Sequence, residues 1–430
     1  MANETVREEV RRIAEAARAA SGALAQTSAE ERNAALAAMA AALRAHAAEI
    51  VAANAEDVEA ARAAGTKESL VDRLMLDEGR IEGMAAALED LAALPDPLGR
   101  VQDARTLESG IELERVSVPL GVVAVVYEAR PNVTADAAGI CLKSGNAAVL
   151  RGGSMAARSN EAVARVLADA AEGAGMPRGC IGLVASTDRA AADELMQLHG
   201  TVDVLIPRGG AGLIRHCVET SKVLVIETGT GNCHVYLHGS ADLERARAIV
   251  VNAKCRRYGV CNAAETLLVD EAAAEKFLPA VLADLRERGV ALHADERARA
   301  VAAESGIEAE PATEDDWATE YLAPELAVRC VAGVDEAVDH VNRYGTKHSE
   351  AIVADPADPA GAAAIEAFLA RVDAAAVYAN ASTAFTDGGQ FGLGAEIGIS
   401  TQKLHARGPF ALEALTSYKY VLRGDGQVRA

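Results

Sequence analysis

Hydrophobic and polar residues follow two different periodic patterns along this chain. Over residues 4–94, apolar residues recur at helical spacing between charged ones, so this part of the chain is predicted to be helical. Thr27 and Ser28 precede Glu30 and Glu31 by three residues, which is the spacing of a capping box at the start of one helix. Asn54 is predicted to cap the next helix, which stops at Gly65. A segment with two prolines and a glycine then breaks the pattern.

From residue 121 onward, short apolar runs alternate with amphipathic stretches. Strands separated by helices predict βαβ units in a mostly parallel sheet, whose ligands bind at the carboxyl ends of the strands. A second α/β unit is predicted from 230 to about 384. The predicted strands are 121–128, 146–153, 180–185, 202–210 and 222–229, and the predicted helices are 134–143, 160–175 and 189–200.

Two further segments have the alternation of exposed strands. Residues 111–119 alternate apolar and polar side chains, which predicts an exposed or edge strand rather than one in a core. Residues 415–426 predict another strand near the end of the chain. Exposed strands of this kind can pair with another subunit, so we expect a homo-oligomer.

The amino-acid composition limits the kinds of molecule that this protein is expected to bind. The 430 residues include 42 Lys and Arg against 63 Asp and Glu, a net charge of −21 that argues against nucleic acid. The N-terminus lacks the features of a signal peptide, and no apolar run is long enough to span a membrane. The seven cysteines show no zinc-site spacing, so no metal site is expected, and free thiols fit a reducing, cytoplasmic compartment.

One cysteine, Cys261, has an unusual setting. Residues 240–259 predict a helix with Ser240 as its cap, and a strand follows soon afterwards. Cys261 therefore lies in a short loop, from which a side chain can reach a cleft. The preceding Arg256 and Arg257 are expected to lower the pKa of the thiol. A buried structural cysteine is the alternative, and spacing alone favours it.

The chain lacks the usual dinucleotide fingerprint. No Gly-x-Gly-x-x-Gly occurs, but glycine turns follow two predicted strands, at 150–154 and 207–212. Their backbone N–H groups could approach a phosphate, with Arg151 or Arg208 adding charge. Taken alone, glycine turns of this kind are more often simple tight turns.

Longer motifs resemble a known enzyme family. They cover nearly the whole chain in order and are similar to gamma-glutamyl phosphate reductases, also called glutamate-5-semialdehyde dehydrogenases. More distantly, the chain resembles the aldehyde dehydrogenase superfamily, whose cofactor domain also lacks the usual fingerprint. The resemblance implies NADPH-dependent reduction of L-glutamyl 5-phosphate to L-glutamate 5-semialdehyde, with release of phosphate, in L-proline biosynthesis. The motifs are residues 118–154, 223–238, 259–269, 343–353 and 386–409.

The resemblance assigns two catalytic residues. Cys261 takes the position of the family nucleophile, which implies a thioester that divides one difficult reduction into two easier steps. Asn132 matches the asparagine whose amide N–H helps to hold the oxyanion, together with the backbone N–H of Cys261. Without the resemblance, Asn132 is better interpreted as a turn residue after Pro131.

The resemblance also assigns a cofactor site. At Ser154, NAD-using relatives often have a glutamate, which repels a 2′-phosphate, whereas Arg151 could pair with one, so NADP is favoured over NAD. Glu320 matches the glutamate that holds the nicotinamide ribose, although a solvated surface carboxylate is the alternative. The assigned cofactor residues are Arg151, Gly152, Gly153, Ser154, Arg208, Gly209, Gly210 and Glu320.

Some residues near the motifs stay without a definite role. Glu227 precedes Cys261 by the spacing of the water-activating base in hydrolytic aldehyde dehydrogenases. A reductase must exclude water, so Glu227 is either turned away or serves as an acid or base for the later intermediate. Lys347, His348 and the segment 380–383 are candidates for contacts with the substrate.

The implied fold is α/β and aldehyde-dehydrogenase-like. It consists of a Rossmann-type NADP-binding domain over 1–228, to which 385–410 returns, and an α/β catalytic domain over 229–384. A small strand extension for oligomerisation is expected near 107–119 and 412–424. The alternatives are a hydrolytic NAD(P)-dependent aldehyde dehydrogenase and a non-catalytic relative. A separate glutamate 5-kinase is a possible functional partner.

Overall fold

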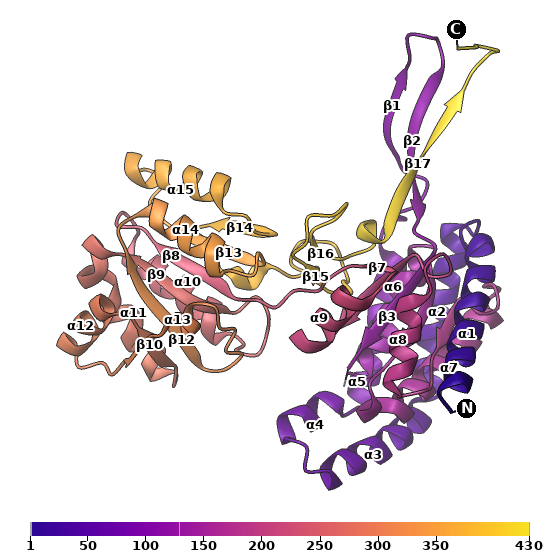
Figure 1. Cartoon of the computed structure of the whole chain (residues 1–430), viewed down its shortest axis with the longest axis horizontal. Helices are drawn as coiled ribbons and strands as arrows, with labels where there is room; N and C mark the ends of the chain where they lie inside the picture. The colour runs from indigo at the N-terminus through magenta and orange to yellow at the C-terminus, as the bar shows by residue number, and fades with distance from the viewer. Residues whose placement is uncertain (1, 129, 430) are drawn as a thin grey trace. The chain divides into compact units, whose positions relative to one another are not determined.

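The computed structural model describes residues 2–128 and 130–429, which form two compact units (Figure 1). The first unit contains Met1–Thr228, Gly392–Gly398 and Phe410–Ala430, and the second contains Gly229–Phe391 and Ile399–Pro409. Of the segment 385–410, which was expected to return to the first domain, only a central piece does so. The residues on either side of that piece belong to the second unit.

The first unit begins with five helices, as the hydrophobic pattern predicts. Ser28 and Glu31 form the predicted capping box at the start of α2. The predicted cap at Asn54 is wrong, because Asn54 lies inside α3 and is buried. Its side chain bonds the backbone of Leu74 and Leu76 and the hydroxyl of Ser159, which joins three elements. The helices are α1 (Ala2–Leu24), α2 (Ala29–Ala45), α3 (Ala47–Ala63), α4 (Glu68–Leu74) and α5 (Glu78–Ala93).

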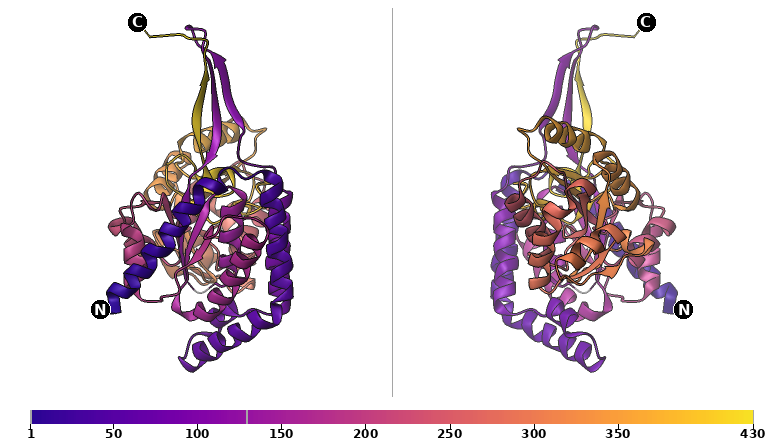
Figure 2. Two further views of the ribbon diagram at one scale, coloured as in Figure 1. Left: turned by 90° about the vertical axis from the view of Figure 1, so that its right-hand side faces the viewer. Right: turned by 90° about the vertical axis from the view of Figure 1, so that its left-hand side faces the viewer.

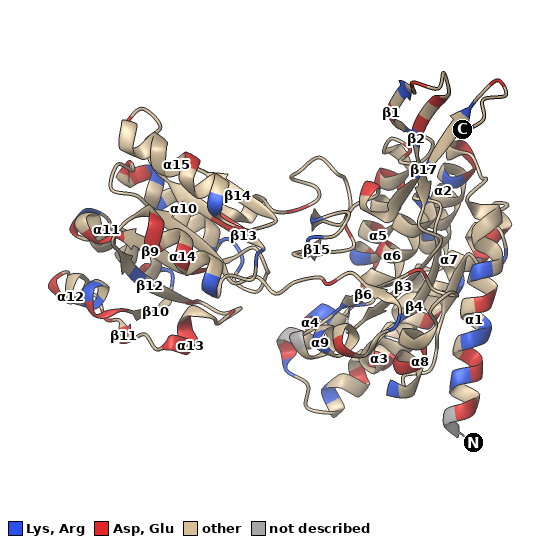
Figure 3. Cartoon of the chain, turned by 45° about the horizontal axis from the view of Figure 1, so that its top comes forward, with Lys and Arg blue, Asp and Glu red and all other residues tan. Residues whose placement is uncertain are grey.

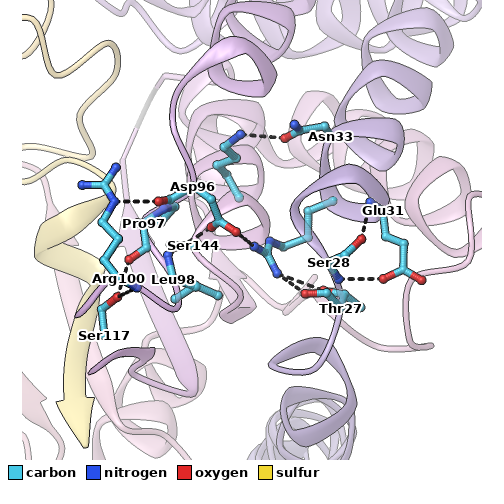
Figure 4. A network of polar contacts seen from close by, with 12 residues as sticks. Thr27, Ser28, Glu31, Asn33, Asp96, Pro97, Leu98, Arg100, Ser117 and Ser144 are labelled. Atoms are coloured by element: carbon cyan, nitrogen blue, oxygen red, sulfur yellow. Dashed lines mark hydrogen bonds and ion pairs between the residues drawn. The ribbon is translucent and has the colours of Figure 1, made fainter. Parts of the chain in front are cut away.

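The break after α5 is held by a polar network around Arg32 (Figure 4). The Arg32 side chain is buried, and it donates to the carboxylate of Asp96 at 2.7 Å and to the backbone oxygen of Thr27. Ser117 donates to the backbone oxygen of Pro97 at 2.7 Å. Buried polar groups need partners, so this network fixes the path of the proline-containing segment.

A five-stranded parallel sheet forms the centre of the first unit, in the order β5-β4-β3-β6-β7. Every residue of β3 is buried, as expected for a strand covered on both faces. Helix α9 was not predicted, because two glycines directly precede it and a third, Gly212, is its second residue. The strands are β3 (Val122–Tyr127), β4 (Ala147–Arg151), β5 (Ile181–Leu183), β6 (Val204–Arg208) and β7 (Leu224–Val225), and the helices are α6 (Asn132–Lys143), α7 (Ala157–Gly173), α8 (Arg189–Gln197) and α9 (Ala211–Thr220).

A separate antiparallel sheet of three strands belongs to the same unit and extends beyond its helices (Figure 2). Its order is β1 (Val101–Thr106), β2 (Glu112–Pro119), β17 (Thr416–Arg423). The prediction that 111–119 is an exposed or edge strand rather than a core strand fits its partial burial, and of the two alternatives it is the exposed one, because it lies between β1 and β17. One edge of this strand pairs with β1, which precedes it in a hairpin and was not predicted, and the other edge pairs with β17 from the end of the chain.

The second unit is built on a seven-stranded parallel sheet, in the order β11-β10-β12-β9-β8-β13-β14. Alternate residues of each central strand contribute to two apolar clusters: helices α10 to α12 line one, and α14 and α15 the other. The strands are β8 (Cys233–Leu237), β9 (Ala264–Asp270), β10 (Ala291–Ala294), β11 (Glu310–Pro311), β12 (Glu325–Val331), β13 (Ser349–Val353) and β14 (Ala376–Ala379). The helices are α10 (Leu243–Cys255), α11 (Ala274–Glu287), α12 (Glu296–Glu304), α13 (Glu314–Trp317), α14 (Val334–Tyr344) and α15 (Pro359–Arg371).

Helix α10, which leads to Cys261, has the predicted apolar face, with Ala246 and Val250 in the core. Its N-cap is Asp242, which accepts from the N–H of Arg245 at 2.8 Å, so the predicted cap at Ser240 is wrong. Ser240 instead accepts from the N–H of Asp355.

Charged residues of both signs alternate along α1 (Figure 3). Within the described residues, no single helix has the length and apolar character to cross a membrane. One pair, Ala29–Ala45 and Ala47–Ala63, passes by length and composition together, but it is bent by 66°.

Candidate active site

Cys261 lies in the turn between α10 and β9, as predicted, and it is half-buried. Its backbone packs directly against Gly231, where an added Cβ would lie 1.4 Å from the carbonyl oxygen of Cys261. Only glycine permits this approach. The buried thiol of Cys233 donates to the same carbonyl oxygen at 3.2 Å. The backbone of the thiol loop is therefore held from two sides.

The residue after the thiol provides a further anchor. Asn262 is buried, and its amide donates to the backbone oxygen of Thr386 at 3.0 Å and to that of Ala384 at 3.3 Å. Thr383 returns a hydrogen bond from its hydroxyl to the backbone oxygen of Asn262 at 2.7 Å. These bonds fix the loop to the segment that follows β14, so a polar residue is needed directly after Cys261.

The other six cysteines have settings that fit structural roles. Cys141, Cys180, Cys217 and Cys233 are buried. Burial raises the pKa of Cys141 and of Cys180 to about 12 and that of Cys217 to about 11. Cys255 ends α10 and is half-buried, and burial raises the pKa of its thiol as well. A raised pKa disfavours the reactive thiolate, so none of these thiols competes as the nucleophile.

Glu320 is connected to the thiol loop through Gly231. Its carboxylate accepts from the N–H of Gly231 at 2.7 Å, and Gly231 in turn packs against Cys261. Burial raises the pKa of Glu320, although the Gly231 N–H and the nearby Lys254 oppose this effect. Such a partly enclosed, hydrogen-bonded group does not fit the alternative of a solvated surface carboxylate.

A fully buried ion pair lies behind this arrangement. The ammonium of Lys254 is 2.5 Å from the carboxylate of Glu265, and neither side chain is exposed. Burial raises the pKa of Glu265 to about 7, with the lysine opposing it. The second oxygen of Glu265 accepts from the N–H of Leu322 at 3.3 Å, where the backbone is left-handed with φ 52°. The pair therefore supports the segment that carries Glu320.

The residues of the second unit that were predicted to contact the substrate are mostly buried or already paired. His348 is fully buried, its Nδ1 lies 2.7 Å from the hydroxyl of Ser349, and burial lowers its pKa to about 4. A histidine that is enclosed in this way stabilises the interior of the unit and is not accessible to a substrate in solution. Lys347 is exposed and lies 3.4 Å from Asp373. In the segment 380–383, the last two residues are buried.

In the first unit, Asn132 is the first residue of α6, directly after the carboxyl end of the central strand β3. Its amide donates to the carboxylate of Asp136, one turn later, at 2.9 Å. Burial raises the pKa of Asp136 to about 6, although the Asn132 hydrogen bond and the charge of Arg208 oppose the shift. Asp136 was not predicted from the sequence, and its only signal is the four-residue spacing from Asn132.

The first glycine turn follows β4. The guanidinium of Arg151 donates to the backbone oxygens of Thr187 and Asp188, at 2.8 and 3.2 Å. Gly152 is buried, and a Cβ there would lie 2.0 Å from the Asn160 amide. Ser154 is exposed at the start of a short 3-10 helix. The arginine is therefore fixed beside an accessible turn, an arrangement that fits a phosphate-bearing nucleotide.

The second glycine turn follows β6 and leads into α9. Gly210 is the N-cap, and its N–H donates to the carboxylate of Glu128 at 2.9 Å. Gly209 packs against the same side chain, which was not singled out from the sequence. A helix N-terminus with accessible N–H groups attracts anions, and the bound carboxylate has the chemistry of one. This turn also fits a pyrophosphate group, which would displace Glu128.

The predicted site residues thus form two sets. The second unit holds Cys261 and Glu320, connected through Gly231. The first unit holds Asn132, the two glycine turns and Glu227, which follows β7 and is half-buried. Each set lies at loops that follow parallel strands or precede helices, where α/β proteins bind their ligands.

The fold has a cysteine loop in one α/β unit and, in the other, glycine turns without the usual dinucleotide fingerprint. This combination defines a class of enzyme. The model of the aldehyde dehydrogenase family matches residues 2–303. The chain therefore belongs to the aldehyde dehydrogenase family, and the predicted fold class is confirmed.

Its relatives narrow the family further. The chain is 55% identical to a gamma-glutamyl phosphate reductase from Moorella thermoacetica, over 98% of this chain and 99% of the relative. It is 52% identical to the one from Thermobifida fusca, over 99% of each. The crystal structure of a gamma-glutamyl phosphate reductase from Thermotoga maritima matches with a TM-score of 0.95 and 44% identity, covering 98% of this chain and all of the other. The resemblance to these reductases is thereby confirmed.

Proposed function

We propose that this protein reduces L-glutamyl 5-phosphate to L-glutamate 5-semialdehyde with NADPH, releasing phosphate, in L-proline biosynthesis. The observation that carries the proposal is the 55% identity, over nearly the full length of both chains, to a relative named gamma-glutamyl phosphate reductase. The anchored loop of Cys261 supplies a nucleophile that such a reaction needs.

In the proposed mechanism, the thiolate of Cys261 attacks the acyl carbon and phosphate leaves, so a thioester forms. The amide of Asn132 and the backbone N–H of Cys261 donate to the oxygen that becomes negative during the attack. One such donor is typically worth about 3 kcal/mol in the transition state. After reduction, the hemithioacetal collapses to the aldehyde and returns the thiol to its first state.

Aldehyde dehydrogenases use a nicotinamide dinucleotide, which supplies the hydride when bound. We assign its phosphates to the two glycine turns and its nicotinamide ribose to Glu320. The exposed residue at position 154 is an uncharged serine rather than a glutamate, which supports NADPH over NADH. Replacement of Arg151 by Ala should raise KM for NADPH roughly tenfold and leave KM for NADH nearly unchanged, because the lost partner is a 2′-phosphate. Equal changes for both would contradict this assignment.

We also propose a cytoplasmic homo-oligomer that pairs through the three-stranded sheet. In that sheet, β17 is an edge strand, and Tyr418, Tyr420 and Leu422 are about half exposed on it. Gel filtration with light scattering should give a mass of at least two chains, and a single-chain mass would contradict the proposal. Coupling to a separate glutamate 5-kinase stays an expectation.

The reverse reaction tests the proposed function directly. The protein is mixed with glutamate semialdehyde and NADP, with and without inorganic phosphate, while NADPH absorbance is followed. We expect NADPH to form only with phosphate. Formation without phosphate, with glutamate as the product, would overturn the proposal and indicate a hydrolytic dehydrogenase with Glu227 as its base.

A further inference from the structure

A half-buried carboxylate next to the oxyanion amide has no role in the mechanism described so far. Helix α6 places Asp136 one turn after Asn132, and the Asn132 amide donates one N–H to the Asp136 carboxylate at 2.9 Å. Among the described residues, this is the one hydrogen bond that the carboxylate receives. The side chain remains partly accessible.

Stability does not explain the choice of an aspartate at this position. Burial raises the pKa of Asp136 to about 6 even though Arg208 and the Asn132 amide oppose the shift, so its charged form is disfavoured there. An asparagine would accept the same hydrogen bond without a charge. A charge retained at a cost in stability is typical of a functional group.

The geometry of the Asn132 amide sets the distance between the Asp136 carboxylate and the carbonyl oxygen that reacts. The two N–H groups of an amide nitrogen diverge by roughly 120°, and each reaches an acceptor at about 2.9 Å. If one N–H holds the acyl oxygen, the Asp136 oxygen on the other lies about 5 Å from that oxygen. In the substrate, four single bonds separate the acyl carbon from the α-ammonium nitrogen, which is a reach of roughly 5 Å.

We propose that Asp136 binds the α-ammonium group of the substrate and thereby selects an α-amino acyl phosphate over its deamino analogue. This inference rests on the proposed function, because it uses Asn132 as the oxyanion donor. An ammonium group on the carboxylate makes a charge-assisted hydrogen bond, which is stronger than a neutral one. It also offsets the half-buried charge more closely than Arg208 does, because the pKa of Asp136 stays raised in the free protein despite that arginine.

The test compares two substrates and one conservative variant. Glutamate semialdehyde, corrected for its cyclised form, and 5-oxopentanoate, which lacks only the amino group, are oxidised with NADP and saturating phosphate. For the wild type, we expect kcat/KM to be roughly 10- to 100-fold higher with glutamate semialdehyde. Asp136→Asn keeps an acceptor for Asn132 but removes the charge. It should raise KM for glutamate semialdehyde by a similar factor and leave the kinetics of 5-oxopentanoate within twofold.

The other outcomes are decisive as well. If the variant loses kcat equally with both substrates, Asp136 only positions Asn132, and the proposal is overturned. An unchanged KM for glutamate semialdehyde would overturn it too. If the wild type forms NADPH with neither aldehyde in a phosphate-dependent way, the proposed function itself has failed. Asp169→Asn, on the exposed surface of α7, removes the same charge from the same unit and should behave like the wild type.

Discussion

The two units support their parts of the site in different ways. In the second unit, the thiol loop and the Glu320 segment rest on enclosed polar groups, including the ion pair of Lys254 with Glu265. His234 and Glu350, also buried, lie 2.9 Å apart in a hydrogen-bonded pair on the same sheet. In the first unit, the assigned cofactor groups are backbone turns and half-buried side chains at the ends of an apolar sheet.

This difference matches the roles that we propose for the two parts. A loop without regular structure has no ladder of backbone bonds, so a nucleophile on it needs side-chain anchors to keep one geometry. A cofactor must enter and leave at each turnover, which accessible turns allow. Precise positioning in one unit and exchange in the other therefore use different kinds of interaction.

The largest expected effect comes from removing the nucleophile. Cys261→Ser should lower kcat by at least about a thousandfold, because a serine hydroxyl without an activating base is a poor nucleophile at neutral pH. Circular dichroism and the thermal midpoint should stay at wild-type values. Cys255→Ser is the matched control, and full activity is expected from it. Activity retained by the first variant and lost by the second would reverse the assignment.

Breaking the buried ion pair tests whether the second unit depends on its polar interior. Lys254→Met leaves the Glu265 carboxylate enclosed without its cation, which should lower the free energy of unfolding by about 3–5 kcal/mol. Urea denaturation measures this change. The double variant with Glu265→Leu should recover most of the stability. If the single variant were as stable as the wild type, the pair would not be the support that we infer.

The oxyanion donor in the first unit should matter for rate but not for folding. Asn132→Ala removes one donor and should lower kcat by roughly 100- to 1,000-fold in the phosphate-dependent assay. Its thermal midpoint should change little, since the residue is half-buried at the start of a helix. A change in KM alone would instead indicate a role in ground-state binding.

The smallest effect concerns the pH dependence of stability. The pKa of Asp136 is raised in the folded protein, to about 6, so the folded state binds more protons than the unfolded state between about pH 4 and 6. The contribution of Asp136 to stability therefore falls as pH rises through this window. Asp136→Asn should match the wild type near pH 4 and exceed it by about 3 kcal/mol at pH 8. A variant less stable at pH 8 would contradict the sign.

Local signals in the sequence determined much of the fold. The capping box of α2, the apolar face of α10 and the alternation of strands and helices each depend on residues a few positions apart. The same signals placed Cys261 in its loop. The long motifs identified the family, because they preserve both order and spacing along the chain.

Only the tertiary structure decided what distant segments do to one another. Asn54 was predicted as a cap but connects three elements, and β1, which was not predicted, makes β2 the central strand of its sheet. Glu128 and Asp136 were noticed only in the structure, where Glu128 accepts a hydrogen bond from a glycine turn and Asp136 accepts one from the residue that begins α6. Sequence periodicity indicates which face of a single helix or strand is buried. The packing and pairing of that element depend on which other elements contact it in the fold. That information is spread over the whole chain.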